Sequence, residues 1–333
     1  MLVSDLVLGI FSLSQASLGL LGNSTLFLVY AGVFFSQAHS RKPTDLILAH
    51  LTMANTITLL TQGVPAMIMI WGQESTSDSV SCRIIIYIRR VSRGLSICTT
   101  CLLSVFQAIT ISPSTSSLAP YKQKAPKYIL YSFFFFWILN SSMYINILAT
   151  TETIKHVNNT VSSYDIRYGA NIFWMNFIND VAFLSTITFR DVFFVFLMTW
   201  SSGYMVMVLH RHRKQVQHIH STSLSPTSSV ETRVTHTILL LVTCFVVFYC
   251  INCTINLFLT FVEEEDYFRL NDTKAFLAIC YPSLCPLVLI NSDRRVPRPH
   301  CVLKRVIGPS PPLDFSEREQ VSSIKCSLPT ARL

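Results

Sequence analysis

Residues 82–113 join a long apolar run to several arginines, a combination that few protein environments can accommodate. As a single helix, residues 82–107 would extend about 37 Å at about 1.5 Å per residue, which exceeds a hydrocarbon core of about 30 Å. Arg89, Arg90 and Arg93 would then lie in the membrane, where each costs roughly 2.5–3.5 kcal/mol on insertion scales. Arginines that persist in such segments usually face a bundle interior or a water-filled cavity. We therefore predict that this helix runs through the centre of a membrane bundle and that its first half faces a cavity open to the outside.

Seven apolar runs along the chain predict an all-α membrane protein, a seven-transmembrane-helix bundle. Each run reaches or approaches the ~17–25 residues that a spanning helix needs. Charged residues make up 13% of the chain, whereas soluble proteins carry about 25%. We expect a transmembrane domain over residues 1–293 and a disordered cytosolic tail over residues 294–333. The predicted helices are residues 7–35, 44–71, 82–111, 128–149, 183–209, 236–261 and 274–291.

Lysine and arginine are concentrated in alternate connections between these runs, and this predicts the orientation. The basic connections are residues 41–42, 122–127, 211–214 and the tail at 294–305. The connections on the other side hold acids instead, among them Glu74, Asp78, Glu152, Asp165 and residues 263–266. Because basic loops stay in the cytosol, we expect the N-terminus outside and the C-terminus in the cytosol. Two glycosylation sequons, at Asn158 and Asn271, fall in predicted outside loops.

Several short segments resemble motifs of the vomeronasal type-1 receptor family, in the same order and spacing. They are RRVSRG at 89–94, TTCLLSVFQ at 99–107, QAITISP at 107–113, FRDVFF at 189–194, SSGYMV at 201–206, HSTSLSP at 220–226, THTILLLV at 235–242 and PLVLINSD at 286–293. The resemblance covers residues from about 20 to 293. It implies a heptahelical G-protein-coupled receptor for pheromones or other small cues, in the plasma membrane of sensory neurons. The implied partners are a heterotrimeric G protein of the Gi/Go type, a small molecule and the lipid bilayer.

Arg89, Arg90 and Arg93 of the third run are candidate ligand-binding residues. Arg89 and Arg93 are four residues apart and share a helix face, with Arg90 beside them. They either anchor an acidic or hydrogen-bonding group of the ligand or pair internally, and the two roles are compatible. The candidate partners for internal pairing are Asp180, Asp191, Glu74 and Asp78.

Arg190 and Asp191 interrupt the fifth run and are further candidates for the ligand site. Adjacent residues point to different sides of a helix, so we expect that these two do not pair well with each other. Each then needs a partner on another helix, or it lines the cavity.

The cytosolic end of the third helix carries Gln107-Ala108-Ile109 where many heptahelical receptors carry Asp-Arg-Tyr. No ionic latch can form through these three residues, so the G-protein contact is expected to use Ile109, Ile111 and basic residues of the next cytosolic loop. Asn55 stands where related receptors hold sodium with an aspartate, and a hydrogen-bonding role inside the bundle is favoured. The predicted switch and G-protein residues are Asn55, Gln107, Ile109, Ile111, Arg211, Arg213 and Pro286.

The cysteines carry weaker predictions. In most heptahelical receptors a cysteine at the place of Cys82 bonds to the second outside loop, yet residues 150–182 contain no cysteine, so Cys82 is either free or has lost its partner. Cys301 follows a basic stretch next to the membrane and is a candidate for palmitoylation.

No nucleophile motif, metal triad or phosphate loop occurs, so we predict no enzyme, metal or cofactor, and no nucleic-acid partner. Three other interpretations stay open. One is a bitter-taste-type receptor with the same fold, and another is a membrane channel or transporter. The third is a degenerate receptor that does not signal, which the missing cysteine of the second outside loop would explain.

Overall fold

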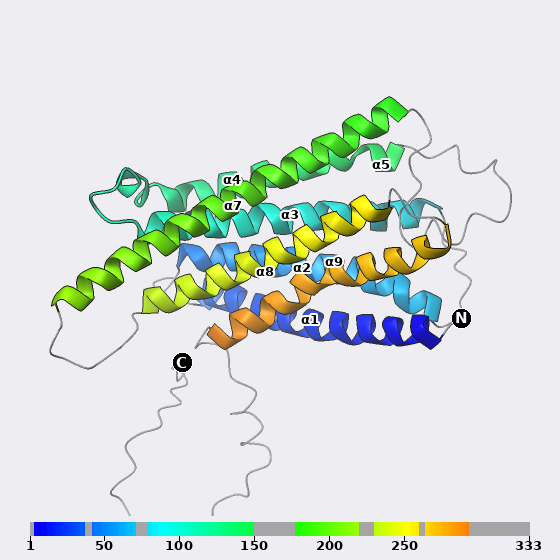
Figure 1. Ribbon diagram of the computed structural model, residues 1–333, viewed down its shortest axis with the longest axis horizontal. Helices are drawn as coiled ribbons and strands as arrows, with labels where there is room; N and C mark the ends of the chain where they lie inside the picture. Colours follow the sequence, from blue (N-terminus) through cyan, green and yellow to red (C-terminus); the bar gives the residue numbers. More distant parts are fainter. Residues whose placement is uncertain are drawn as a thin grey trace, which may run out of the picture. The chain divides into compact units, whose positions relative to one another are not determined.

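The computed structural model describes residues 3–36, 42–70, 79–149, 177–219, 230–259 and 264–292, and all regular structure in these ranges is helical. The helices are α1 (Val3–Ser36), α2 (Pro43–Ile70), α3 (Ser79–Ile111), the 3-10 turn η1 (Ala119–Tyr121), α4 (Ala125–Tyr144), α5 (Asn146–Ala149), α7 (Phe177–Ile219), α8 (Val230–Leu259) and α9 (Glu264–Ser292). Figure 1 shows the long helices side by side in one bundle. The predicted all-α seven-helix bundle is confirmed.

Six helices contain segments long and apolar enough to cross a membrane within the described ranges. These segments are Gly9–Val33, Arg83–Ile111, Ala125–Leu148, Ser185–His212, Arg233–Ile255 and Thr273–Ser292. The exception, α2, is 28 residues long, but it carries Asp45, His50, Asn55, Gln62 and several threonines. These polar side chains reduce its hydropathy without shortening it, and α2 takes its place in the bundle as the remaining predicted helix.

The third helix lies at the centre of the bundle, as the sequence predicts. In its apolar window 72% of the residues are buried, compared with 22–44% in the other five. It packs against α2, α4, α7 and α8. The helix ends at Ile111 because Pro113 disfavours helical geometry at Ser112. Ser112 is then held by a 2.9 Å hydrogen bond between its hydroxyl and that of Tyr204 on α7.

The contact between α1 and α9 explains why α9 tolerates two prolines. Pro286 has no N–H to offer to the carbonyl of Pro282, four residues earlier. The Nδ2 of Asn23 on α1 donates to that carbonyl at 2.8 Å. Gly19 and Gly22 allow the close approach, since a β-carbon there would lie 2.7 Å from Ser283 and 2.9 Å from Pro286. A neighbouring helix therefore satisfies the backbone carbonyl that the proline leaves without its helical donor.

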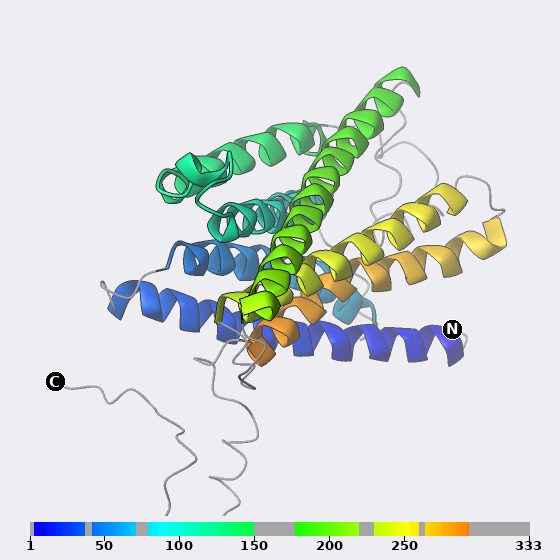
Figure 2. The ribbon, with the colours of Figure 1, turned by 60° about the vertical axis from the view of Figure 1, so that its left-hand side comes forward.

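Two helices extend well beyond their predicted limits. α7 has 43 residues, about 64 Å at 1.5 Å per residue, and Figures 1 and 2 show it projecting past its neighbours. α9 begins at Glu264, so Asn271 lies in helical backbone rather than in the predicted loop. Glu264, Glu265 and Asp266 occupy its first turn, where acidic side chains favour the start of a helix.

Candidate functional site

A cavity opens between α2, α3, α8 and α9. The space between its side chains is about 440 Å³ when its open mouth is included, and about 40 Å³ of that admits the centre of a water-sized molecule. One wall is aromatic, and Phe245 meets Tyr281 edge-on with ring centroids 4.8 Å apart. The lining residues are Thr58, Arg93, Ser96, Ile97, Phe245, Phe248, Tyr249, Asn252, Leu277, Ala278, Tyr281 and Pro282.

Arg93 is the charged residue among those that line the cavity. Within the described part of the chain its guanidinium makes no hydrogen bond or ion pair with another residue, although its side chain is half-buried. On the opposite wall, the buried Oδ1 atom of Asn252 also has no partner among the described residues. The cavity thus presents both an unused cation and an unused acceptor.

The neighbouring arginines have different surroundings. Arg89 donates from Nη1 to Oε1 of Gln62 on α2, at 3.2 Å. Arg90 interacts electrostatically with Tyr144, Arg93, Arg190 and Asp191, and it is not among the residues that line the cavity. The predicted partners Glu74, Asp78 and the side chain of Asp180 lie outside the described residues.

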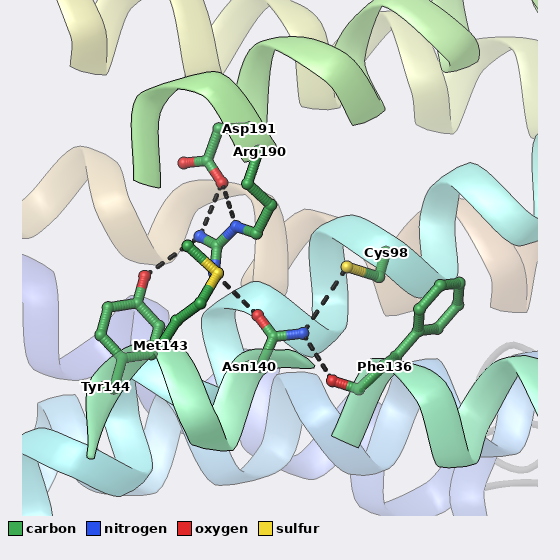
Figure 3. Close-up of polar contacts among 7 residues, drawn as sticks. All are labelled: Cys98, Phe136, Asn140, Met143, Tyr144, Arg190 and Asp191. Atoms are coloured by element: carbon green, nitrogen blue, oxygen red, sulfur yellow. Dashed lines mark hydrogen bonds and ion pairs between the residues drawn. The ribbon is translucent and has the colours of Figure 1, made fainter. Parts of the chain in front are cut away.

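Arg190 and Asp191 on α7 form a buried ion pair, with 2.6 Å between Nη2 and Oδ1. Arg190 also donates from Nε to the same oxygen at 2.9 Å. Its remaining donors reach α4, where Nη1 bonds Oδ1 of Asn140 at 2.8 Å and Nη2 bonds the hydroxyl of Tyr144 at 3.0 Å (Figure 3). The network closes on α3, since Asn140 donates to the Cys98 sulfur at 3.6 Å.

The expectation that Arg190 and Asp191 do not pair with each other is therefore wrong. Their β-carbons do diverge around the helix, but the arginine side chain is long and its fork offers donors on two sides. The guanidinium bends back toward Asp191 while its outer edge faces α4 (Figure 3). Neither residue is among those that line the cavity.

Gly94 on α3 makes room for this network. A β-carbon at Gly94 would lie 2.8 Å from Cγ of Asn140 and 3.0 Å from Nη1 of Arg190. The residue that follows Arg93 must therefore lack a side chain if α3, α4 and α7 are to meet at the ion pair.

At the Gln107 end of α3, the bundle is held by hydrogen bonds that involve α8. Gln107 on α3 is buried and donates from Nε2 to Oγ1 of Thr235 at 3.2 Å. Two residues to either side of Thr235 on α8, the Thr237 hydroxyl donates to the Ser292 hydroxyl at 2.6 Å, and Arg233 donates to the carbonyl of Asn291 at 3.1 Å. Within the part of the chain that the structure describes, this end therefore joins α3, α8 and α9 through hydrogen bonds and without an ion pair.

A chain of hydrogen bonds leads from the cavity into the core of the bundle. Tyr281 lines the cavity and shares a 2.8 Å hydrogen bond with Thr100 on α3. Beside it, Ser96 donates to Oδ1 of the fully buried Asn55 at 2.8 Å. Asn55 thus lies inside the bundle as a hydrogen-bonding residue.

Comparison with known proteins agrees with this arrangement. The family model described as the vomeronasal organ pheromone receptor family matches residues 7–301. The chain belongs to the vomeronasal type-1 receptor family. Human vomeronasal type-1 receptor 4 is 37% identical over 292 residues, which cover 86% of this chain and 94% of that protein. Rat vomeronasal type-1 receptor 96 is 36% identical over 300 residues (89% and 91%), and zebrafish olfactory receptor class A-like protein 1 is 33% identical over 292 residues (86% and 90%).

Membership of the vomeronasal type-1 receptor family makes this chain a multi-pass plasma-membrane protein, as the sequence predicts. Several predicted sites of the receptor lie outside the described residues. These are the side chains of Cys82, Arg213 and Asn271, together with Asn158 and Cys301. Of the other predicted switch residues, Ile109 and Ile111 are partly buried, Arg211 is exposed on the long end of α7, and Pro286 packs against Gly22.

The receptor also uses residues that the sequence did not single out. Asn140 and Tyr144 hold Arg190, while Asn252 and Tyr249 line the cavity. The sequence does contain a signal for Asn140. It is a polar amide within a spanning segment, and the seven residues before it, 133–139, are all apolar or aromatic. Such residues usually face a protein partner rather than lipid.

Proposed function

We propose that this chain is a chemosensory receptor that binds a small pheromone or odorant in the cavity between α2, α3, α8 and α9 and signals through a Gi/Go-type G protein. The observation that carries the ligand site is Arg93, a cation that lines the cavity without an ion-pair partner among the described residues. An unpaired charge in a spanning segment is costly. A ligand that brings an acidic or acceptor group recovers part of that cost.

The cavity lining defines the kind of molecule that would fit. Phe245, Phe248 and Tyr249 offer an apolar, aromatic wall for the body of the ligand. The Arg93 guanidinium binds an acidic or hydrogen-bond-accepting group at one end, and Oδ1 of Asn252 accepts from a donor such as a hydroxyl. Small-molecule sites typically combine apolar walls with a few polar groups of this kind.

The space for water-sized molecules is about 40 Å³, far below the ~300 Å³ at the lower end of ligand pockets. Ligand binding therefore requires the aromatic wall to move outward. α8 contributes this wall and also the Thr235 contact at the other end, so a ligand that displaces α8 shifts the population toward a state with that contact open. The opened surface near Gln107, Ile109, Ile111, Arg211 and Arg213 is where we place the G protein.

We assign Arg190 and Asp191 to the structure of the receptor rather than to ligand contact. Their polar atoms bond to each other, to Asn140 and to Tyr144, and both residues are at most 9% exposed. Arg89, bound to Gln62, and Arg90 are proposed to support the positive potential at Arg93.

The test is a ligand-evoked calcium or G-protein dissociation assay in transfected cells, normalised to surface receptor through an N-terminal tag. Arg93→Ala is expected to raise the effective ligand concentration at least tenfold, and Arg93→Lys is expected to restore part of it. Thr254→Ala is the control, because Thr254 lies two residues from Asn252 but is exposed, bonds to the Cys250 carbonyl of its own helix and does not line the cavity. A potent ligand whose potency is unaffected by Arg93→Ala would sink the proposed site, and a response that survives inactivation of Gi/Go α-subunits would sink the coupling.

A further inference from the structure

The outer face of α4 changes in chemical character along its length. Seven residues lie on this face within about 60° of one direction, at the spacing of successive helical turns. In chain order they are Lys124, Lys127, Tyr128, Tyr131, Phe134, Phe135 and Ile138, and all are exposed. The buried residues of α4 lie on the opposite side, and they include Ile129, Phe133 and Phe136.

This order of residues matches the layers at the edge of a bilayer. From Lys127 to Ile138 the helix rises about 16 Å, from charge through tyrosine to hydrocarbon. Tyr128 and Tyr131 are 58% and 73% exposed, and their ring centroids are 6.4 Å apart. Tyrosine favours the headgroup level of a membrane, where its ring is apolar and its hydroxyl is hydrated. The tyrosines therefore mark the boundary, and the lysines lie at the level of the phosphates.

The lysines are electrostatically uncompensated. Residues 112–144 contain no aspartate or glutamate, and Lys122, Lys124 and Lys127 form no ion pair with any residue of the described ranges. Their backbone is fixed by successive turns, in which the amides of Lys122, Lys124 and Lys127 donate to the carbonyls of Ala119, Tyr121 and Lys124 at 3.0–3.2 Å. The three ammonium groups are thus presented from an ordered segment.

We propose that the foot of α4, defined as Lys122, Lys124, Lys127, Tyr128 and Tyr131, binds the headgroup of an anionic phospholipid. The ammonium groups pair with the phosphates, the tyrosine hydroxyls donate to phosphate or ester oxygens, and the rings and Phe134 lie along the acyl chains. A lipid is favoured over an acidic protein segment because the apolar stripe continues directly from the lysines, so one amphipathic molecule covers both. This inference does not depend on the proposed ligand or G protein.

The test uses the purified full-length receptor in nanodiscs of phosphatidylcholine alone, or of phosphatidylcholine with phosphatidylserine or phosphatidylinositol 4,5-bisphosphate. Bound anionic lipid is measured by native mass spectrometry, and the thermal midpoint is measured in each disc. We expect a higher midpoint in the anionic discs. The double variant Lys124→Gln/Lys127→Gln is expected to bind anionic lipid about tenfold more weakly or worse, since each basic residue near an anionic surface contributes roughly a factor of five.

The control removes equal charge elsewhere at the same end of the bundle. Arg211→Gln/Lys214→Gln changes two exposed residues on the projecting end of α7 and is expected to keep the lipid effect. Tyr128→Phe/Tyr131→Phe preserves the rings and is expected to weaken lipid binding less than the lysine changes do.

Four results would overturn the proposal. They are an equal loss in both charge variants, no difference between the discs, an equal shift with soluble inositol trisphosphate in neutral discs, or lysine variants that impair G-protein coupling while lipid binding stays the same.

Discussion

Gly94 of α3 lies so close to Asn140 of α4 that the side-chain amide occupies the space of a β-carbon. That amide in turn accepts from Arg190 of α7 at 2.8 Å. Three helices therefore converge on one missing side chain. The arrangement explains why an arginine-rich segment of α3 ends in glycine, where helix propensity alone would favour alanine.

Gly94→Ala is expected to destabilise the receptor by about 1–3 kcal/mol, the usual cost of overpacking a core, despite the better helix propensity of alanine. The measurement is the thermal midpoint of detergent-solubilised receptor, together with surface expression. Gly203→Ala is the matched control, because Gly203 is a helical glycine on α7 with open space around its β-carbon position. It should be neutral or slightly stabilising. Equal behaviour of the two variants would show that α4 can move away at little cost.

Asp191→Asn is expected to lower stability by about 3–5 kcal/mol, because it leaves the buried Arg190 without a counter-charge. The double variant Arg190→Met/Asp191→Leu removes both charges and should recover much of that loss. In variants that reach the surface, ligand potency should stay within about threefold of wild type, because neither residue lines the cavity. Loss of a direct ligand contact worth about 1.4 kcal/mol would instead lower potency about tenfold. A loss of ligand potency without a loss of stability would show instead that Arg190 and Asp191 contribute to ligand binding.

Asn23→Ala is expected to lower the free energy of unfolding by about 1–3 kcal/mol. The substitution removes the donor to the buried carbonyl of Pro282, which Pro286 cannot replace because it has no N–H. Thr25→Ala serves as the control, since Thr25 is exposed on the same helix and bonds only to the Leu21 carbonyl, four residues earlier. Thermal midpoints of the two variants provide the comparison. If Thr25→Ala proved as damaging as Asn23→Ala, the effect would belong to α1 itself and not to its contact with α9.

The sequence predicts the bundle well because its strongest signals do not depend on how the helices pack. They are the length of the apolar runs, the charges within them and the backbone chemistry of proline. Apolar runs of membrane length locate the helices, and the arginines of residues 82–113 place α3 at the centre. Proline effects also follow from backbone chemistry, which is why the need for a donor near Pro282 is predictable. The identity of that donor, Asn23, depends on how α1 packs against α9 and is not encoded in either segment alone.

The Arg190–Asp191 pair shows where sequence reasoning stops. Helix geometry fixes the directions of the β-carbons, but the position of a guanidinium depends on four side-chain torsions and on the partners that surround it. Asn140 and Tyr144 come from a helix some 50 residues away in the chain. The cavity has the same limit, because its lining residues on α8 and α9 carry no pattern that separates them from other apolar positions.

Gln107→Ala is expected to raise basal G-protein signalling, because it removes the hydrogen bond from α3 to Thr235 on α8. A neutral hydrogen bond contributes about 1 kcal/mol, so the ratio of open to closed receptor should rise about fivefold. Basal nucleotide exchange on the G protein, divided by surface receptor, is the measurement. Thr110→Val is the control, since Thr110 is exposed one turn away and bonds only to the Phe106 carbonyl of its own helix.

The opposite outcome for Gln107→Ala is equally informative. If both basal and ligand-evoked signalling fall while surface expression holds, Gln107 contributes to the active state or to the G-protein contact, and the bond to Thr235 does not hold the bundle closed. Thr235→Val separates the two cases, because it removes the acceptor and leaves the glutamine free to meet a G protein. A rise in basal signalling with Thr235→Val and a fall with Gln107→Ala would assign the closing role to α8 and the coupling role to α3.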